Sequence, residues 1–143
     1  MAITTRTDLG EVRISKKIIA DMISSILSDP ELSGRIWPAT EHGHAIGKRT
    51  KIAEIVDLRD SDFASNIEAD TDQAGDVTVE FSVIVRFGES IRALTRTIAD
   101  RIAETMQYTL GIKPAVIIIN IAGVKSKQIA RRNTRTIYKY API

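Results

Sequence analysis

The stretch from Val77 to Ala122 constrains the fold more than any other part of the chain, because it has the pattern of a strand, a helix and a second strand in succession. Its first section alternates between apolar and polar residues, interrupted on the polar face only by Ile84. The apolar positions are Val77, Val79, Phe81, Val83, Val85 and Phe87. A period of two predicts a half-buried strand, which we expect to end at Gly88.

The next section has helical spacing. Ser90 is suited to cap a helix, since its hydroxyl can accept a backbone N–H of the first turn. Apolar residues then recur at three- and four-residue intervals and predict a buried stripe: Ile91, Leu94, Ile98, Ile102, Met106 and Leu110. Gly111 can close the helix in the left-handed conformation. Val116–Ala122 is apolar on both faces, which favours a central strand that lies parallel to the first one.

The remaining elements are shorter. The sequence predicts a short strand at Gly10–Ile14, a helix over 16–28 capped by Ser15, a long loop over 31–51, a short helix near 51–59 and an edge strand at Asn66–Asp70. We therefore expect an α+β fold: a two-layer sandwich with a small mixed sheet, helices on one face and the split βαβ order of ferredoxin-like proteins. The other face of the sheet would be left to water or to a partner.

Charge is distributed unevenly along the chain. Residues 1–122 carry 14 basic and 18 acidic side chains, whereas residues 123–143 carry six basic side chains and no acidic one. We therefore predict a single domain over residues 1–124, which includes the long loop, followed by a basic C-terminal tail over 125–143. The candidates for binding an anion or a partner are Lys125, Lys127, Arg131, Arg132, Arg135 and Lys139. Such a tail could be a solubilising or self-associating segment, or it could bind anionic lipid, protein or nucleic acid.

Little in the sequence points to chemistry. The chain has no cysteine, which excludes disulfides, thiolate metal sites and cysteine nucleophiles. His42 and His44 are weak metal candidates, because two histidines without a third defined ligand fall short of a usual zinc site. We expect no catalytic residue, no metal and no cofactor. Lys48, Arg49 and Lys51 form a basic loop that could meet a phosphate, although the spacing of a phosphate-binding loop is missing.

The N-terminal residues have no apolar run of the kind found in signal peptides. The longest purely apolar run, Ala115–Ile119, is far too short to span a bilayer. We therefore expect a cytoplasmic protein whose membrane contact, if it has one, is peripheral or made through a partner.

Several local motifs together resemble a known family. They are an aromatic residue followed by glycine at Phe87–Gly88, the helix start Ser90–Ile91, the sequence LGI before an apolar strand, Gly123–Val124, and the opening GEVRISKKIIADMI. These features, over roughly residues 9–28 and 66–124, resemble the alkaline shock protein family of Gram-positive bacteria, which are general-stress and envelope-stress proteins. The middle of the chain departs from that pattern, because WPATEHGHAIGKRT and LRDSDF replace the family's Gly-rich loop.

The resemblance implies a non-enzymatic protein without cofactors. Family members self-associate, and some are held at the inner membrane face by a separate membrane-anchored partner. We therefore expect a stress-associated scaffold or interaction protein that binds copies of itself, with the polar strand Asn66–Asp70 as one candidate edge, and that sits near the cell envelope through a partner. The alternative is a nucleic-acid-binding module that uses the basic loop and the tail.

Overall fold

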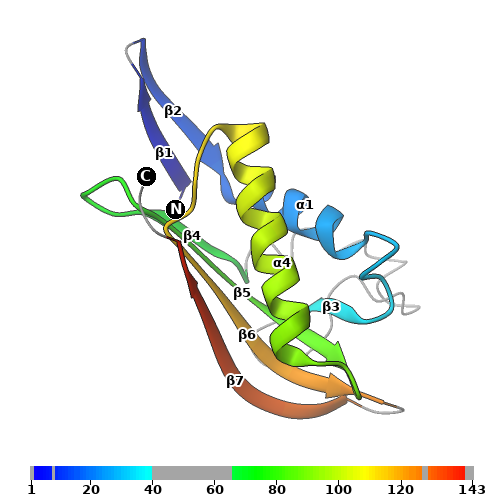
Figure 1. Ribbon diagram of the computed structural model, residues 1–143. Coiled ribbons are helices and arrows are strands. Elements are labelled where there is room, and N and C mark those ends of the chain that lie inside the picture. The colour runs from blue at the N-terminus through cyan, green and yellow to red at the C-terminus, as the bar shows by residue number, and fades with distance from the viewer. Residues whose placement is uncertain (1, 8, 40–65, 127–128, 141–143) are drawn as a thin grey trace, which may run out of the picture.

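A computed structural model of the chain describes residues 2–7, 9–39, 66–126 and 129–140 (Figure 1). The described elements are, in chain order, β1 (Ala2–Thr7), β2 (Gly10–Ser15), α1 (Lys16–Leu27), β3 (Ile36–Ala39), β4 (Glu68–Thr71), β5 (Val77–Arg86), α4 (Ile91–Thr105), the π-helical turn η1 (Met106–Leu110), β6 (Val116–Lys125) and β7 (Ile129–Lys139). β1 and β2 form an antiparallel hairpin. The other strands form one mixed sheet.

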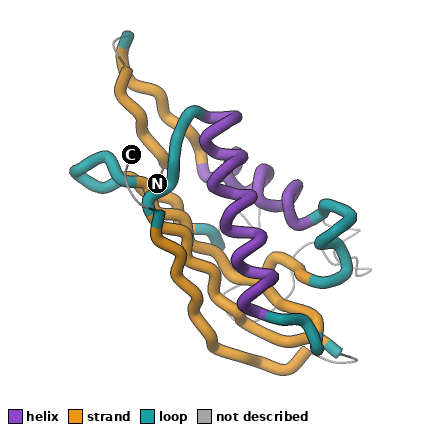
Figure 2. The backbone as a smooth tube through the Cα atoms, viewed as in Figure 1, coloured by secondary structure: helices purple, strands orange, loops and turns teal. Residues whose placement is uncertain are grey.

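The predicted strand–helix–strand unit is confirmed as β5, α4 and β6. β5 and β6 pair as parallel strands. Alternate residues of β5, such as Val79, Phe81 and Val83, are buried in one core together with Ile98 and Ile102 of α4. Figure 2 shows α1 and α4 over the same face of the sheet, as expected. The apolar face of β5 and the apolar stripe of α4 therefore pack together in a single core.

The predicted split βαβ order is wrong. In that arrangement another strand separates the two parallel strands, but here β5 and β6 are direct neighbours. The sheet runs β3-β5-β6-β7, and β4 pairs with β5 beyond the end of β3. β3 opposes the second half of β5, from Ser82 to Val85, and β4 opposes its first half, from Val77 to Glu80. Two short antiparallel strands therefore share one edge of β5.

The helix ends follow the local sequence. Ser15 Oγ accepts a hydrogen bond from Ile18 N at 3.4 Å, and Ser90 Oγ accepts one from Ala93 N at 3.2 Å, so both predicted N-caps are confirmed. α4 ends earlier than predicted, because the chain widens into the π-helical turn η1. Gly111 closes this turn with φ +69°, the left-handed conformation expected from the sequence.

The outer face of the sheet, opposite the helices, is partly buried. Ile84 is the one apolar residue on the predicted polar face of β5, and it is fully buried. Ser82 and Ala39, which oppose each other on β5 and β3, are buried as well. Trp37 lies directly opposite Ile84 and is partly exposed. The expectation of a face left wholly open therefore does not hold around Ile84.

The predicted basic tail is wrong for residues Ile129–Lys139. They form β7, which pairs antiparallel with β6. Tyr138 and Tyr140 pack against the core beside α4, and the hydroxyl groups of Thr95 and Tyr138 lie 2.6 Å apart. Because the segment has a full strand ladder and apolar contacts, it is part of the domain and not an appendage to it.

Two further strands differ from the prediction. β1 was not predicted, and it pairs with β2 over six residue pairs from Ala2–Ser15 to Thr7–Gly10. β3 lies inside the segment predicted as a long loop, and its Pro38 opposes Val83, an edge-strand position that proline tolerates. The predicted edge strand is confirmed as β4. The predicted helix near 51–59 lies outside the described residues.

Candidate interaction surfaces

The predicted anion-binding residues are spread along β6 and β7. Arg135 and Lys139 are exposed on the outer face, on either side of Ile137, which is 50% exposed. Lys125 ends β6, and Arg131 pairs with Gly123 in the register of β7. Arg132 also belongs to β7, whereas Lys127 lies outside the described residues. The described residues of this set therefore lie along β7 and at the end of β6.

Arg135 faces a carboxylate. Its Nη2 lies 3.6 Å from Glu80 Oε1, and Asn120 Nδ2 donates a hydrogen bond to Glu80 Oε2 at 2.9 Å. These three residues come from β7, β5 and β6, and they form a polar cluster across the middle of the outer face. Part of the positive charge of β7 is therefore balanced within the chain.

The two edges of the sheet carry opposite charges in the same row. The register places Asp70 of β4 opposite Thr78, Thr78 beside Val116, and Val116 opposite Lys139 of β7. Asp70 and Lys139 are both exposed. Among the described residues, no strand forms a backbone ladder with the outer side of either β4 or β7. β1 lies beside the end of β4, where Thr4 N donates a hydrogen bond to Thr71 Oγ1 at 3.1 Å. An acidic edge and a basic edge thus lie at opposite sides of one sheet.

A second surface lies where β5 turns into α4, which we call the Phe87 turn (residues 86–89). Phe87 was predicted to lie on the buried face of a strand, but β5 ends at Arg86 and the Phe87 side chain is 72% exposed. Its backbone N donates to the carbonyl oxygen of Lys125 at 2.7 Å. Gly88 follows with φ +93°, a conformation that glycine adopts without strain.

Cations surround the Phe87 turn. Lys125 Nζ lies 4.6 Å from the centroid of the Trp37 ring, within the range of a cation–π interaction. Glu89 Oε1 accepts hydrogen bonds from Arg35 Nε at 2.9 Å and from Arg35 Nη2 at 2.8 Å, while Glu89 Oε2 accepts from Arg86. Hydrogen bonds from Arg35 and then from Arg86 hold the pKa of the Glu89 carboxyl below its usual value. Arg35 and Glu89 are 54 residues apart, so sequence reasoning had no local signal for this cluster.

Neither predicted loop site falls within the described part of the chain. His42 and His44, the metal candidates, lie outside it, as does the basic loop Lys48–Lys51. Among the described residues there is no group of three or more His, Asp or Glu side chains that could hold a metal ion. These earlier hypotheses therefore remain predictions.

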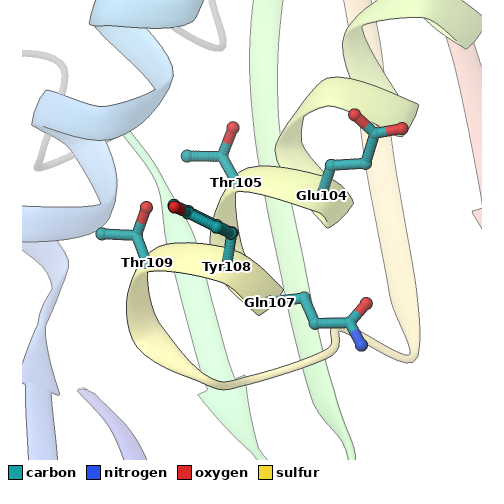
Figure 3. A pocket seen from close by; sticks show the side chains of 5 residues that line it. All are labelled: Glu104, Thr105, Gln107, Tyr108 and Thr109. Atoms are coloured by element: carbon teal, nitrogen blue, oxygen red, sulfur yellow. The ribbon is translucent and has the colours of Figure 1, made fainter.

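A shallow pocket lies over the end of α4 (Figure 3). All five of its lining residues come from one continuous segment of α4 and η1: Glu104, Thr105, Gln107, Tyr108 and Thr109. Figure 3 shows these side chains fanning out from the helix. Tyr108 is 94% exposed. Side chains of this kind do not converge on one point, as the polar groups of an enclosed ligand site do.

A comparison with known protein families identifies the family to which this chain belongs. The profile of the alkaline shock protein 23 family, described by a cell envelope-related function, matches residues 4–126. The chain belongs to the alkaline shock protein 23 family. The match confirms the resemblance drawn from the sequence motifs, and it includes β2, α1 and the Phe87 turn. No curated protein sequence and no solved structure matches the chain significantly. No helix among the described residues is both long enough and apolar enough to cross a membrane.

Proposed function

We propose that this member of the alkaline shock protein 23 family is a non-enzymatic scaffold that builds assemblies of its own copies at the cell envelope. The observation that carries the proposal is the row across the sheet with Asp70 at one edge and Lys139 at the other. Unpaired strand edges are templates for another chain, and opposite charges favour pairing between unlike edges over pairing between like edges.

Strand directions support a specific arrangement. β4 is antiparallel to β5, β5 is parallel to β6, and β7 is antiparallel to β6. β4 and β7 therefore run in the same direction. A second copy shifted sideways, without being turned over, would set its β4 beside β7 of the first as a parallel strand. Lys139 of one copy then lies in the same row as Asp70 of the next.

The lengths of the two edges also agree. In the register of the sheet, Arg135 of β7 lies opposite Asn120 of β6, and Asn120 lies beside Ser82 of β5. Ser82 in turn lies opposite Ala39 of β3. β7 therefore spans the rows of both short strands on the opposite edge, β4 and β3. Contact between unlike edges is heterologous, and between copies related by a sideways shift it does not close into a ring, so it produces open-ended assemblies. We propose that a free terminal edge, or the exposed end of such an assembly, is where a membrane-anchored partner binds.

Size-exclusion chromatography with light scattering, over a range of concentrations and salt, tests this arrangement. Lys139→Glu replaces the attraction between Lys139 and Asp70 of the next copy by a repulsion between two carboxylates. Because an exposed ion pair contributes up to about 1 kcal/mol, we expect the dissociation constant to rise about fivefold or more. Asp70→Lys has the same effect alone. The double variant, with both charges exchanged, restores association.

The matched control is Lys17→Glu, a charge reversal on α1 away from both edges, which leaves association unchanged. Raising the salt concentration weakens association, because exposed charges are screened. A wild-type chain that stays monomeric at every concentration contradicts the proposal. So does a double variant that is no better than either single variant.

Nucleic-acid binding is the second candidate and has less support. The basic loop Lys48–Lys51 lies outside the described residues, and Arg135 already faces Glu80. Binding that depended on phosphate contacts would weaken steeply with salt, so a titration with single-stranded DNA at two salt concentrations separates the two candidates.

A further inference from the structure

We propose that the Phe87 turn is a site of direct contact with an anionic lipid bilayer, with the Phe87 ring inserted among the lipids and Arg86 and Lys125 placed against their phosphates. This surface is separate from the sheet edges. It adds to the proposed scaffold a means of touching the membrane without a partner protein.

The exposure of Phe87 is the first argument. It is a large apolar side chain that is 72% exposed, although the rest of the apolar face of β5, from Val77 to Val85, is buried. Because β5 ends at Arg86, the ring lies in a turn beyond the last strand pair and not over the core. Removing an exposed aromatic ring from water is favourable, and phenylalanine is among the residues that peripheral membrane segments bury at the boundary between headgroups and acyl chains.

The charges around the ring are the second argument. Arg35, Arg86 and Lys125 contribute three positive charges next to this turn, and Glu89 contributes one negative charge, which leaves a net charge of +2. The Arg35 and Arg86 side chains are 40% and 52% exposed, whereas that of Glu89 is only 13% exposed. The cations therefore face the solvent more than the carboxylate that pairs with them. Exposed cations of this kind are attracted to anionic lipid headgroups, and a lipid surface is compatible with the cell envelope-related description of the family.

The position of the turn in the molecule is the third argument. Phe87 is tied to the end of β6 by its hydrogen bond to Lys125, and β7 begins there, since Ile129 pairs with Lys125. Figure 1 shows the end of β5, the end of β6 and the start of α4 at one end of the molecule. At the opposite end, the turn between β4 and β5 carries Asp70, Asp72 and Asp76, and Lys139 and Lys113 lie near these carboxylates. The Phe87 turn is thus the end of the sheet where exposed cations accompany an exposed aromatic ring.

Co-sedimentation of the full chain with vesicles tests the proposal. We expect binding to vesicles of phosphatidylglycerol and phosphatidylcholine, and little binding to phosphatidylcholine alone. Phe87→Ser is expected to reduce the partition coefficient about tenfold, the loss of one buried aromatic side chain. Tyr108→Ser removes another exposed aromatic ring, at the far end of α4, and is the matched control that leaves binding unchanged.

The contribution of the Lys125 charge and the depth to which residue 87 enters the bilayer are tested separately. Lys125→Gln is expected to weaken binding about fivefold, while Lys113→Gln, on the loop before β6, leaves it unchanged. Phe87→Trp keeps binding, and its fluorescence is quenched by lipids brominated in the acyl chain by more than that of the wild-type protein, whose only tryptophan is Trp37. Thermal unfolding of each variant verifies that it is folded.

The proposal is wrong if the wild-type chain does not bind anionic vesicles, or if Phe87→Ser and Tyr108→Ser bind them equally well. It is also wrong if the surface binds a single-stranded oligonucleotide through Phe87 and does not bind vesicles. Phe87→Ser is expected to self-associate like the wild type, and Lys139→Glu to keep Phe87-dependent binding, so failure of this proposal and failure of the scaffold proposal are distinguishable.

Discussion

The hydroxyl oxygens of Thr95 and Tyr138 lie 2.6 Å apart and join the middle of α4 to β7. Thr95 is fully buried, and its hydroxyl also donates towards the carbonyl oxygen of Ile91 at 2.7 Å. Arg96 lies over the Tyr138 ring at 5.5 Å from its centroid. The last strand is therefore held by the long helix as well as by β6.

Tyr138→Phe removes one partner of this contact. We expect the free energy of unfolding to fall by about 1 kcal/mol, the usual worth of one hydrogen bond, because Thr95 keeps its bond to Ile91. Urea unfolding followed by circular dichroism measures the change. Tyr108→Phe, at an exposed phenol, is the control and should leave the midpoint in place. A loss of less than a few tenths of a kcal/mol for Tyr138→Phe would show that the contact contributes nothing.

A chain that ends at Lys125 tests whether β7 belongs to the domain. It loses the whole β6–β7 ladder and exposes the edge of β6, an apolar strand that includes Ile119 and Ile121. We expect the cooperative unfolding transition to disappear and the protein to aggregate, as an exposed apolar edge does. Retention of the wild-type urea midpoint after this truncation would mean that β7 is dispensable.

Because of Glu89, we expect the free energy of unfolding to depend on pH in the acid range. Its pKa is lowered in the folded chain by the hydrogen bonds from Arg35 and Arg86, so the unfolded chain binds a proton more readily. Stability is therefore full above the ordinary glutamate pKa, about 4.3, and is lost as pH falls below it. We expect Glu89→Gln to be less stable at pH 7 and to show a shallower decline between pH 5 and pH 3. Urea midpoints across this range test it, with Glu104→Gln as the matched control.

Tyr140 is expected to make the free energy of unfolding depend on pH in the alkaline range, with the opposite sign. Burial, followed by the charge of Asp100 and a hydrogen bond to its carboxylate at 3.2 Å, raises the pKa of the phenol. The folded chain thus keeps this proton when the unfolded chain has lost it, so stability declines as pH rises above about 10. We expect Tyr140→Phe to flatten this decline. Unfolding midpoints between pH 8 and pH 11 measure it, and Tyr108→Phe should keep the wild-type slope.

The elements that were predicted correctly are those whose pattern is local. β5 alternates, α4 has its cap, stripe and closing glycine, and β6 is continuously apolar. β7 was not predicted, because its basic residues were interpreted as a charged tail although polar and apolar residues alternate along it. Thr134, Thr136 and Tyr138 face the core side, while Arg135 and Ile137 face outwards, and this period of two was present in the sequence.

The rest depends on distant residues. The placement of Asp70 and Lys139 at opposite ends of one row of four strands follows from the register, which no local window of the sequence contains. The same holds for Arg35 and Glu89. The shift in register of β6 between Ile121 and Gly123, and the widening of α4 into η1, also have no sequence signal that we recognise. The sequence therefore indicated the strand of Asp70 and the residue Lys139 as separate candidates, whereas their common row and the Phe87 turn were visible only in the folded chain.

Adjacency of β5 and β6 also has a kinetic consequence. The two strands are parallel, so their first contact, Thr78 with Val116, closes a long loop that contains the whole of α4. The β6–β7 hairpin, in contrast, closes between Lys125 and Ile129. Hairpins form within microseconds, whereas pairings between distant residues are slower because of the entropy of loop closure. The rate-limiting step of folding should be the docking of β5 onto a hairpin that has already formed, and a newly made chain exposes the β6 edge until that step is complete.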